Sequence, residues 1–382
     1  MKDKRVVLAA ALAFILVFSL FLGFDVLSTR QSAPDFWFGV EMAYSNATFN
    51  DVKTLVDEVK DYTNLFVIGS PEISMNQTLL NMTCDYISNA GLHFIILFTD
   101  TTMYNLNNSP RIWIPMAKEK YGDKFLAVYR YDEPGGRTLD HGIHPIIDQS
   151  AVGQTANYTF AAGRYVEVLY SLLSYYLYPS PSLLTSDYGL FWFDYQAGYN
   201  TVLTEFGSNH SREQAIALCR GAAEAFGRDW GTIITWQNDN YPWIESPSLL
   251  YQDLVLSYRN GARYSVVFDY PKNGTYGILT KEHLDAMKNF WSYVQGHPKD
   301  YGVEASNVAY VVPSDYGFGF RNALDHVWVW NSDILSAKVY GDVERLLAQY
   351  GSRLDIVYDD AETFAGVQNR YSQLFFWNET IP

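Results

Sequence analysis

Cysteine and clustered histidine are scarce in this chain of 382 residues. It has two cysteines, Cys84 and Cys219, and seven scattered histidines, with no HExxH or CxxC pattern. Such patterns supply the ligands of many zinc sites, so we expect no metal, and we expect no other cofactor. The helices predicted to carry the two cysteines lie on opposite sides of the fold derived below, so we expect two buried free thiols.

Positive charge is also in short supply. Lys and Arg total 27 against 42 Asp and Glu, which gives a formal net charge of −15. Nucleic acids and anionic membrane surfaces attract basic proteins, so this balance argues against both as partners. Aromatic residues, in contrast, make 16% of the chain. Tyr and Trp suit faces that are half apolar and half wet, such as sugar-binding clefts, although a tyrosine-rich surface without that role is the alternative.

The N-terminus combines basic residues with a long uncharged segment. Lys2, Lys4 and Arg5 precede nineteen residues, 6–24, that carry no charge. This length spans a bilayer, and the basic flank should stay inside the cell. We therefore expect a transmembrane signal anchor within residues 1–27 and a linker at 28–36, with a cleaved signal peptide as the alternative.

Several Asn-x-Ser/Thr triplets agree with a location outside the cytoplasm. These glycosylation acceptors begin at Asn46, Asn76, Asn81, Asn107, Asn157, Asn209, Asn273 and Asn378. Together with the anchor they predict a glycoprotein at the cell surface, or a secreted one if the N-terminal segment is cleaved.

Short apolar runs alternate with amphipathic stretches from residue 37 to residue 297. The predicted strands are Trp37–Met42, Leu65–Ile68, His93–Phe98, Phe125–Tyr129, Gly189–Tyr195, Thr201–Phe206, Thr232–Gln237 and Tyr264–Phe268. Eight strands with intervening helices over this length predict a (β/α)8 TIM barrel. A doubly wound open sheet is the alternative, but no glycine-rich phosphate loop follows the first strand.

The C-terminal part, residues 303–382, predicts a small α/β domain of flavodoxin-like type. Two apolar runs, Val308–Pro313 and Leu354–Tyr358, have the pattern of parallel strands around a helix at 335–350. A further apolar run at Leu374–Trp377 adds a candidate strand. The chain thus predicts an anchor, a linker, a barrel and this small domain.

Acidic residues stand at or near the ends of the predicted strands: Glu41, Glu72, Asp100, Asp132, Glu133, Asp194, Glu205, Asp239 and Asp269. The strands of a barrel all open their C-terminal ends to one mouth, so these carboxylates should converge there. Hydrolysis of a glycosidic bond needs two carboxyl groups that flank the bond. The pattern therefore favours a glycosidase.

Glu133 is the first candidate for catalysis. The stretch FLAVYRYDEPGG (125–136) ends the fourth strand, and Pro134 stiffens the turn that carries Glu133. We predict Glu133 as general acid, supported by Asp132, and Glu205 as the partner carboxylate, with Asp239 and Asp269 as alternative partners. For each acid the alternative is a structural role, in which it caps a helix or pairs with Arg130, Arg137 or Arg263.

Further residues near the strand ends are predicted to bind substrate. Aromatic rings suit the C–H faces of sugar rings, and polar groups beside them suit the hydroxyl groups. The predicted substrate-binding residues are Glu41, Asp132, Tyr195, Trp236, Asn238, Asp239, Trp243 and Asp269.

The chain resembles the clan A-type (β/α)8-barrel glycoside hydrolases, which include β-galactosidase-like and related glycosidases. The resemblance rests on Asp132-Glu133-Pro134 after strand four, where that clan has Asn-Glu with the Glu as acid/base. It also rests on the small domain that begins AYVVPSDYGFGFR and ends LDIVYDD, so it covers residues 36–360. The clan has its nucleophile Glu at the end of strand seven, where this chain reads Trp236-Gln237-Asn238-Asp239.

The resemblance implies an extracytoplasmic hydrolase that cleaves a polysaccharide or glycan. The absent strand-seven Glu keeps a second interpretation open, namely a non-catalytic carbohydrate-binding or cell-envelope structural glycoprotein on the same barrel. A metal-dependent hydrolase is a third interpretation, which the scattered histidines disfavour. The sugar, the linkage and the oligomeric state stay open.

Overall fold

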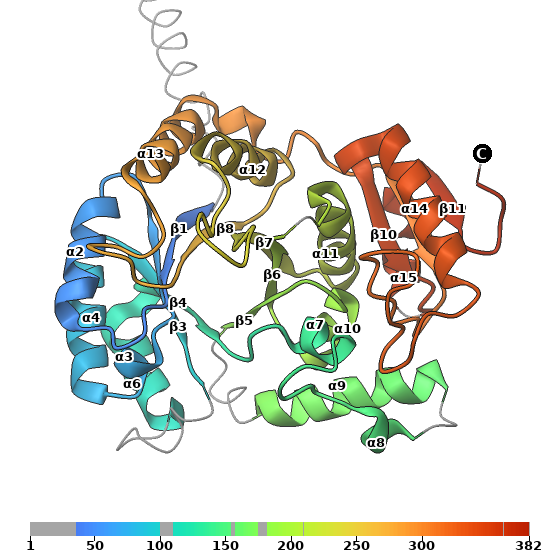
Figure 1. Ribbon diagram of the computed structural model, residues 1–382, viewed down its shortest axis with the longest axis horizontal. Coiled ribbons are helices and arrows are strands. Elements are labelled where there is room, and N and C mark those ends of the chain that lie inside the picture. The colour runs from blue at the N-terminus through green and yellow to red at the C-terminus, as the bar shows by residue number, and fades with distance from the viewer. Residues whose placement is uncertain are drawn as a thin grey trace, which may run out of the picture. The chain divides into compact units, whose positions relative to one another are not determined.

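The computed structural model describes residues 36–99, 110–153, 157–174, 182–208, 210–361 and 363–381. Eight parallel strands close into a barrel in chain order, which confirms the predicted architecture (Figure 1). The strands are β1 (Trp37–Met42), β2 (Leu65–Ile68), β3 (His93–Leu97), β4 (Phe125–Tyr129), β5 (Ser182–Asp187), β6 (Thr201–Phe206), β7 (Asp229–Ile234) and β8 (Tyr264–Asp269).

Helices surround the barrel because each buries one apolar face against the strands. The longer ones are α2 (Phe49–Val59), α4 (Gln77–Asn89), α6 (Pro110–Tyr121), α9 (Tyr158–Ser174), α11 (Arg212–Phe226), α12 (Pro247–Arg259) and α13 (Lys281–Gly296). The shorter ones are α3 (Pro71–Ser74), α7 (Pro134–Leu139), α8 (Gln149–Val152) and α10 (Phe191–Ala197). Single 3-10 turns are η1 (Gly122–Lys124), η2 (Pro298–Asp300), η3 (Gly351–Arg353) and η4 (Gln368–Arg370).

The inside of the barrel is a packed apolar core rather than a pore. Its buried members are Leu65, Val67, Ile95, Ala127, Tyr129, Leu184, Leu203, Ile233, Tyr264 and Val266. Side chains that alternate along the strands fill such a barrel in layers, which leaves only the two ends open. Any site must therefore lie at an end of the barrel.

The fifth strand differs from the prediction. The run Gly189–Tyr195 was predicted as a strand, but it falls on helix α10, and β5 lies earlier at Ser182–Asp187. All residues of α10 except Gln196 are buried. An apolar run that is buried on every side carries no periodicity that separates a strand from a helix, so this prediction is wrong. Strand β7 also begins and ends earlier than predicted, which leaves Trp236 in the loop that follows it.

The C-terminal part, called the small domain below, contains a small sheet of three parallel strands. These are β9 (Val308–Val312), β10 (Leu354–Tyr358) and β11 (Gln373–Phe376), in the order β10–β9–β11. Helices α14 (Ser336–Tyr350) and α15 (Phe364–Val367) belong to the same domain. In Figure 1 this domain lies beside α11, at the right of the view.

Helix α11 joins the barrel to the small domain. Arg220 of α11 is buried, and its Nε donates to Asp355 Oδ1 of β10 at 2.8 Å. Its Nη1 donates to Asn260 Oδ1 at 2.7 Å. Trp192 of α10 also packs against Tyr358 of β10, with ring centroids 5.1 Å apart. A buried ion pair and an aromatic contact therefore fix the domain against the barrel.

Both cysteines are buried and unpaired, as predicted, with Cys84 on α4 and Cys219 on α11. Within the described ranges, no helix combines the length and the apolar character that a membrane crossing requires. The predicted anchor at residues 6–24 lies outside those ranges.

Candidate functional site

Carboxylates gather at the C-terminal end of the barrel, around a cavity of about 700 Å³. Glu41 and Glu205 lie near the ends of β1 and β6, and Asp132 and Glu133 follow β4. All four line the cavity. The parallel topology brings them together, since every strand points its C-terminal end at this mouth.

A constrained turn positions Glu133. Both Tyr131 and Glu133 have left-handed backbone conformations, with φ of 53° and 55°. Such conformations cost free energy in residues other than glycine, and they persist where the surroundings hold them in place. Pro134 then begins α7, and the backbone N–H groups of Gly135 and Gly136 donate to the carboxylate of Asp187, at 2.6 and 2.8 Å.

The two glycines are required because the chain after β5 packs directly on them. A Cβ atom on Gly135 would clash with the carbonyl oxygen of Gly189, and one on Gly136 would clash with the ring of Tyr188. The turn Asp132-Glu133-Pro134-Gly135-Gly136 therefore packs against the C-terminal end of β5 and the residues that follow it. This contact supports the turn that carries Glu133.

Asp187 is a residue that the sequence analysis missed, because the fifth strand was misplaced. Its carboxylate also accepts the backbone N–H of Tyr188, at 2.7 Å. Burial raises its pKa to about 7. Asp194, predicted as a strand-end acid, instead lies on α10, where it accepts the hydroxyl of Tyr165 at 2.6 Å. Burial, and then the charge of Asp187, raise the pKa of Asp194 well above its ordinary value.

A hydroxyl network joins the carboxylates of β4 and β6. Ser186, on β5, donates to Asp132 Oδ1 at 3.1 Å and to Glu205 Oε1 at 3.0 Å. The Tyr129 hydroxyl donates to Asp132 Oδ1 at 2.5 Å and lies 2.7 Å from the Ser186 hydroxyl. The Ser186 hydroxyl has one proton, so it donates to only one of the two carboxyl groups at a time. The network holds Asp132 and Glu205 at a defined separation.

Glu133 and Glu205 line the same cavity, and their carboxyl groups influence each other electrostatically. Burial, and then the charge of Asp132, raise the pKa of Glu133, and Arg137 counteracts them. Burial, and then the charges of Glu133 and Asp132, raise the pKa of Glu205 well above its ordinary value.

Arg137 on α7 distinguishes the two members of the pair. Its Nε donates to Glu133 Oε2 at 3.1 Å, and its Nη2 donates to Asp132 Oδ2 at 2.9 Å. In the described part of the chain no arginine or lysine forms an ion pair with Glu205. An adjacent cation stabilises the charged form of a carboxyl group, so Glu133 is the member that carries the negative charge and Glu205 is the member that keeps its proton.

Glu41 lies on the floor of the cavity, with 3% of its surface exposed. Burial, and then the charge of Asp132, raise its pKa to about 8. None of the hydrogen bonds among the described residues reaches its carboxyl group. A buried polar group without a partner is costly unless a ligand or water satisfies it, so Glu41 is a candidate to bind a substrate hydroxyl.

Aromatic rings form the opposite wall of the cavity. Trp236 stacks on Tyr270, with centroids 5.7 Å apart and planes 13° apart, and its Nε1 donates to the carbonyl oxygen of Tyr270 at 2.7 Å. Phe268 lies beside them. Flat rings with polar edges suit the apolar faces of sugars, and Trp236 was predicted for this role.

The other predicted binding residues divide into two groups. Asn238 and Asp239 line the rim of the cavity and are exposed. Trp243, Asp269 and Tyr195 do not line it. Trp243 packs behind Trp236, with centroids 5.5 Å apart.

Asp269 and Tyr195 are occupied by the scaffold. Asp269 accepts the backbone N–H groups of Gly277 and Leu279, so it holds the loop after β8. Tyr195 is buried on α10, and its hydroxyl donates to the carbonyl oxygen of Asp229 at 2.8 Å. Its predicted location at a strand end is wrong, because the fifth strand lies elsewhere.

Several lining residues were missed as site residues in the sequence. They are Tyr129, Arg137, Ser186, Tyr188, His210 and Arg321. Arg137 lies four residues after Glu133 on α7, a spacing at which helical side chains meet, so that signal was present in the sequence. Arg321 comes from the small domain, and no local pattern connects it with the barrel.

No group of three or more His, Cys, Asp or Glu side chains is arranged to hold a metal ion, as far as the described ranges extend. The polar side chains that line the cavity include carboxyl groups, hydroxyl groups, two arginines and His210. These groups can donate and accept protons and stabilise positive charge.

Comparison with known proteins finds no protein-family model that matches the chain and no match among curated proteins. Among solved structures, α-L-fucosidase isoenzyme 2 from Paenibacillus thiaminolyticus is similar, at 12% identity and a TM-score of 0.50. The likeness covers 89% of this chain and 59% of the fucosidase chain, so this chain spans about three fifths of that protein.

Two further similar structures also carry carbohydrate-enzyme names. A β-1,3-glucanosyltransferase from Rhizomucor miehei has 12% identity and a TM-score of 0.41, over 65% of this chain and 94% of that one. A family 1 β-glucosidase from Thermotoga maritima has 10% identity and a TM-score of 0.39, over 66% and 87%. At such identities the likeness concerns the fold alone, and it agrees with the barrel architecture.

Proposed function

We propose that this protein is a glycoside hydrolase that cleaves a polysaccharide or glycan with Glu133 and Glu205. The observation that carries the proposal is that these two carboxyl groups line one cavity at the barrel mouth, and that burial raises the pKa of both. They share the cavity with Trp236 and Tyr270, which offer a flat face to a sugar ring. A pair of carboxyl groups with raised pKa values, one protonated and one ionised, is the equipment for acid-assisted cleavage of a glycosidic bond.

The environments of the pair suggest how the roles divide. The sequence assigned the acid role to Glu133, but Glu133 pairs with Arg137, while no arginine or lysine among the described residues forms an ion pair with Glu205. We therefore assign proton donation to the leaving-group oxygen to Glu205. Glu133, as the ionised partner, attacks or stabilises the anomeric carbon. Asp132 and Arg137 hold Glu133 in place, and Glu41 accepts a substrate hydroxyl.

The assigned roles imply retention of configuration. In retaining sites an ionised carboxylate attacks the anomeric carbon while the second carboxyl group donates the proton, and the two groups lie roughly 5–5.5 Å apart. In inverting sites the groups lie roughly 6.5–9.5 Å apart, and the ionised one activates a water. Glu133, as the ionised group, is proposed to act as the nucleophile.

The location and partners of the protein form part of the proposal. The uncharged segment 6–24 and the glycosylation triplets support a cell-surface protein that is anchored through this segment, or a secreted one if it is cleaved. The proposed partner is a carbohydrate substrate, and the two-carboxylate mechanism requires no cofactor.

A non-catalytic carbohydrate-binding protein is the second candidate. The observation that favours it is that β7 and its following loop contribute Ile233, Thr235 and Trp236 to the deep cavity wall, with only the exposed Asp239 as an acid. A barrel that has no glutamate at the end of strand seven can bind a glycan at its aromatic side chains without cleaving it. Hydrolysis by the wild type separates the two candidates.

The test is a screen of the wild-type protein against soluble polysaccharides and aryl glycosides, followed by proton NMR of the first product formed. We expect hydrolysis with retained anomeric configuration. Glu205→Gln should lower kcat by about 10²–10⁴, the usual contribution of a general acid. Binding without hydrolysis in the wild type, or an unchanged rate in Glu205→Gln, would overturn the proposal.

A further inference from the structure

The small domain contributes directly to the cavity. Arg321 lies in the segment between β9 and α14, and it lines the same cavity as Glu133 and Glu205. A groove of about 550 Å³ continues from there, lined by Asp140, Ser208 and His210 of the barrel and by Arg321, Leu324 and His326 of the small domain. The cavity and the groove share four residues, so they form one continuous trough.

Arg321 is fixed at this junction by carboxylates on both sides. Its Nε and Nη2 donate to the two oxygens of Asp325, at 2.8 and 2.7 Å, and its Nη1 donates to Asp140 after α7. A guanidinium has two N–H groups on each terminal nitrogen, so each of these nitrogens keeps one N–H for a ligand. Only 19% of the Arg321 side chain is exposed, so ligand contacts there would be partly shielded from water.

The segment around Arg321 is constrained. Asp315, Phe320 and Trp328 all have left-handed backbone conformations, with φ between 55° and 60°. The carbonyl oxygen of Phe320 accepts the side-chain amide of Gln214 on α11, at 2.8 Å. A segment that keeps three such conformations and is tied to a barrel helix is held by its surroundings, as in ligand-binding loops.

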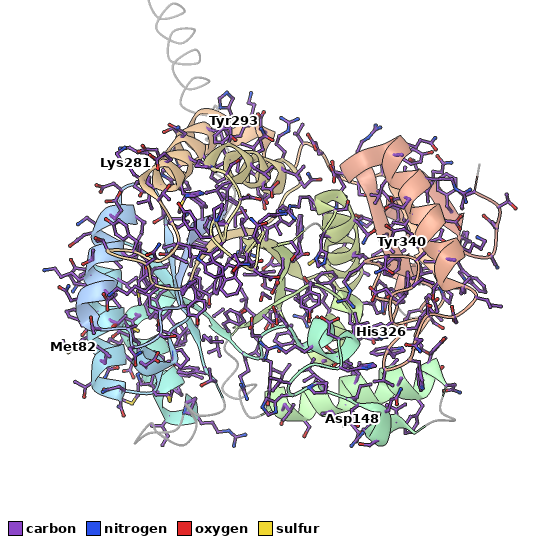
Figure 2. The ribbon with its side chains drawn as sticks, in the orientation of Figure 1. Met82, Asp148, Lys281, Tyr293, His326 and Tyr340 are labelled. Carbon is purple, nitrogen blue, oxygen red and sulfur yellow. The ribbon has the colours of Figure 1, made fainter. Side chains whose placement is uncertain are left out.

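The groove has the chemistry of a sugar-binding surface. It offers donors from Arg321 and Asn322, an acceptor from Asp140, and an apolar surface from Leu324, which is 79% exposed. His326, labelled in Figure 2, also lines the groove and lies against His141, with ring centroids 4.7 Å apart and the planes tilted by 34°. Arg321 is neutralised by Asp140 and Asp325, so the groove favours an uncharged ligand over a uronate or a sulfated sugar.

We propose that this groove is a second sugar-binding subsite, in which Arg321 and Leu324 bind the units of an extended, uncharged glycan next to the unit held at Glu133 and Glu205. The inference rests on the proposed function, and it names the substrate class as a chain rather than a single terminal sugar. The small domain is then part of the substrate-binding cleft.

Affinity electrophoresis in native gels tests the proposal, with laminarin, barley β-glucan, xylan and galactomannan as the polysaccharides. The Glu133→Gln protein is used so that the chain is not degraded. We expect at least one polysaccharide to retard it, and we expect Arg321→Ala in the same background to weaken that association about tenfold. Arg345→Ala is the matched control, because Arg345 lies on α14 of the same domain, is 59% exposed and does not line the trough.

Arg321→Ala leaves the buried Asp325 without its cation, so it can damage the fold of the segment. Leu324→Asp avoids that cost because Leu324 is exposed, and it should also weaken retardation while the thermal midpoint stays unchanged. The proposal is overturned if no polysaccharide retards the protein, or if both variants are retarded as strongly as the control. A wild type that is retarded but hydrolyses nothing contradicts the proposed hydrolysis and leaves the subsite standing.

Discussion

Two pairs of acids lie at or near the C-terminal ends of barrel strands in this protein, and their surroundings differ. Asp187 and Asp269, the last residues of β5 and β8, accept backbone N–H groups from α7 and from the loop after β8. Glu133 and Glu205 contact side chains instead, namely Arg137 and Ser186 respectively. Position at a strand end therefore does not identify a reactive carboxylate.

The difference lies in what satisfies the carboxylate oxygens. Backbone amides cannot move away, so an acid that they occupy is fixed and contributes to stability. Side chains can exchange partners when a substrate enters, so an acid that they hold keeps its capacity to react. We call Asp187 and Asp269 the fixed pair and Glu133 and Glu205 the mobile pair. Mutation of the fixed pair should lower stability, and mutation of the mobile pair should lower activity.

The largest effect is expected for the mobile pair. Removal of the proton donor by Glu205→Ala should lower kcat about 10³-fold on glycosides with poor leaving groups, and much less on dinitrophenyl glycosides, whose leaving group needs no proton. Removal of the ionised partner by Glu133→Ala should abolish both activities. Rates on matched substrate pairs decide between these roles, and the reverse pattern would restore the acid role to Glu133.

Asp187→Ala should give the largest loss of stability. It leaves the N–H groups of Gly135 and Gly136 without their acceptor, and each unsatisfied buried donor costs about 1–3 kcal/mol. We expect the free energy of unfolding to fall by about 2–4 kcal/mol in urea denaturation. Glu205→Gln, measured alongside, should not reduce stability. Equal losses in the two variants would remove the distinction between the pairs.

Glu41 should make stability depend on pH. Its pKa is raised from 4.5 to about 8 in the folded protein, so the fold holds this proton more tightly than the unfolded chain. Its contribution is full below pH 4.5 and is lost as the pH rises to about 8. Relative to Glu41→Gln, the thermal midpoint of the wild type should therefore fall between pH 5 and pH 8.5. Parallel curves for the two proteins would contradict the shift.

The smallest effect is expected at Tyr195. Its hydroxyl donates to Asp229 within the scaffold and does not reach the cavity. Tyr195→Phe should lower the free energy of unfolding by about 1 kcal/mol, the usual net value of a hydrogen bond. The values of kcat and KM should stay at the wild-type level. A rise in KM would place Tyr195 among the substrate contacts after all.

Local pattern alone determined much of this protein. Short apolar runs predicted seven of the barrel strands to within a few residues, and the turn Asp132-Glu133-Pro134 indicated a site at the barrel mouth. Both features are set by residues that are close together in the sequence. Parallel topology then made Glu133 and Glu205 converge, since strand ends share one mouth.

Only the tertiary structure decided the rest. The run at 189–195 falls on α10, which packs against α9, α11 and the small domain and is buried on every side. A run that is apolar on all faces has no periodicity that distinguishes a helix from a strand. That displacement hid Asp187, which holds the turn of Glu133. Arg321 reaches the cleft from more than a hundred residues further along the chain. Contacts of this kind depend on packing between distant segments, and a local pattern does not encode them.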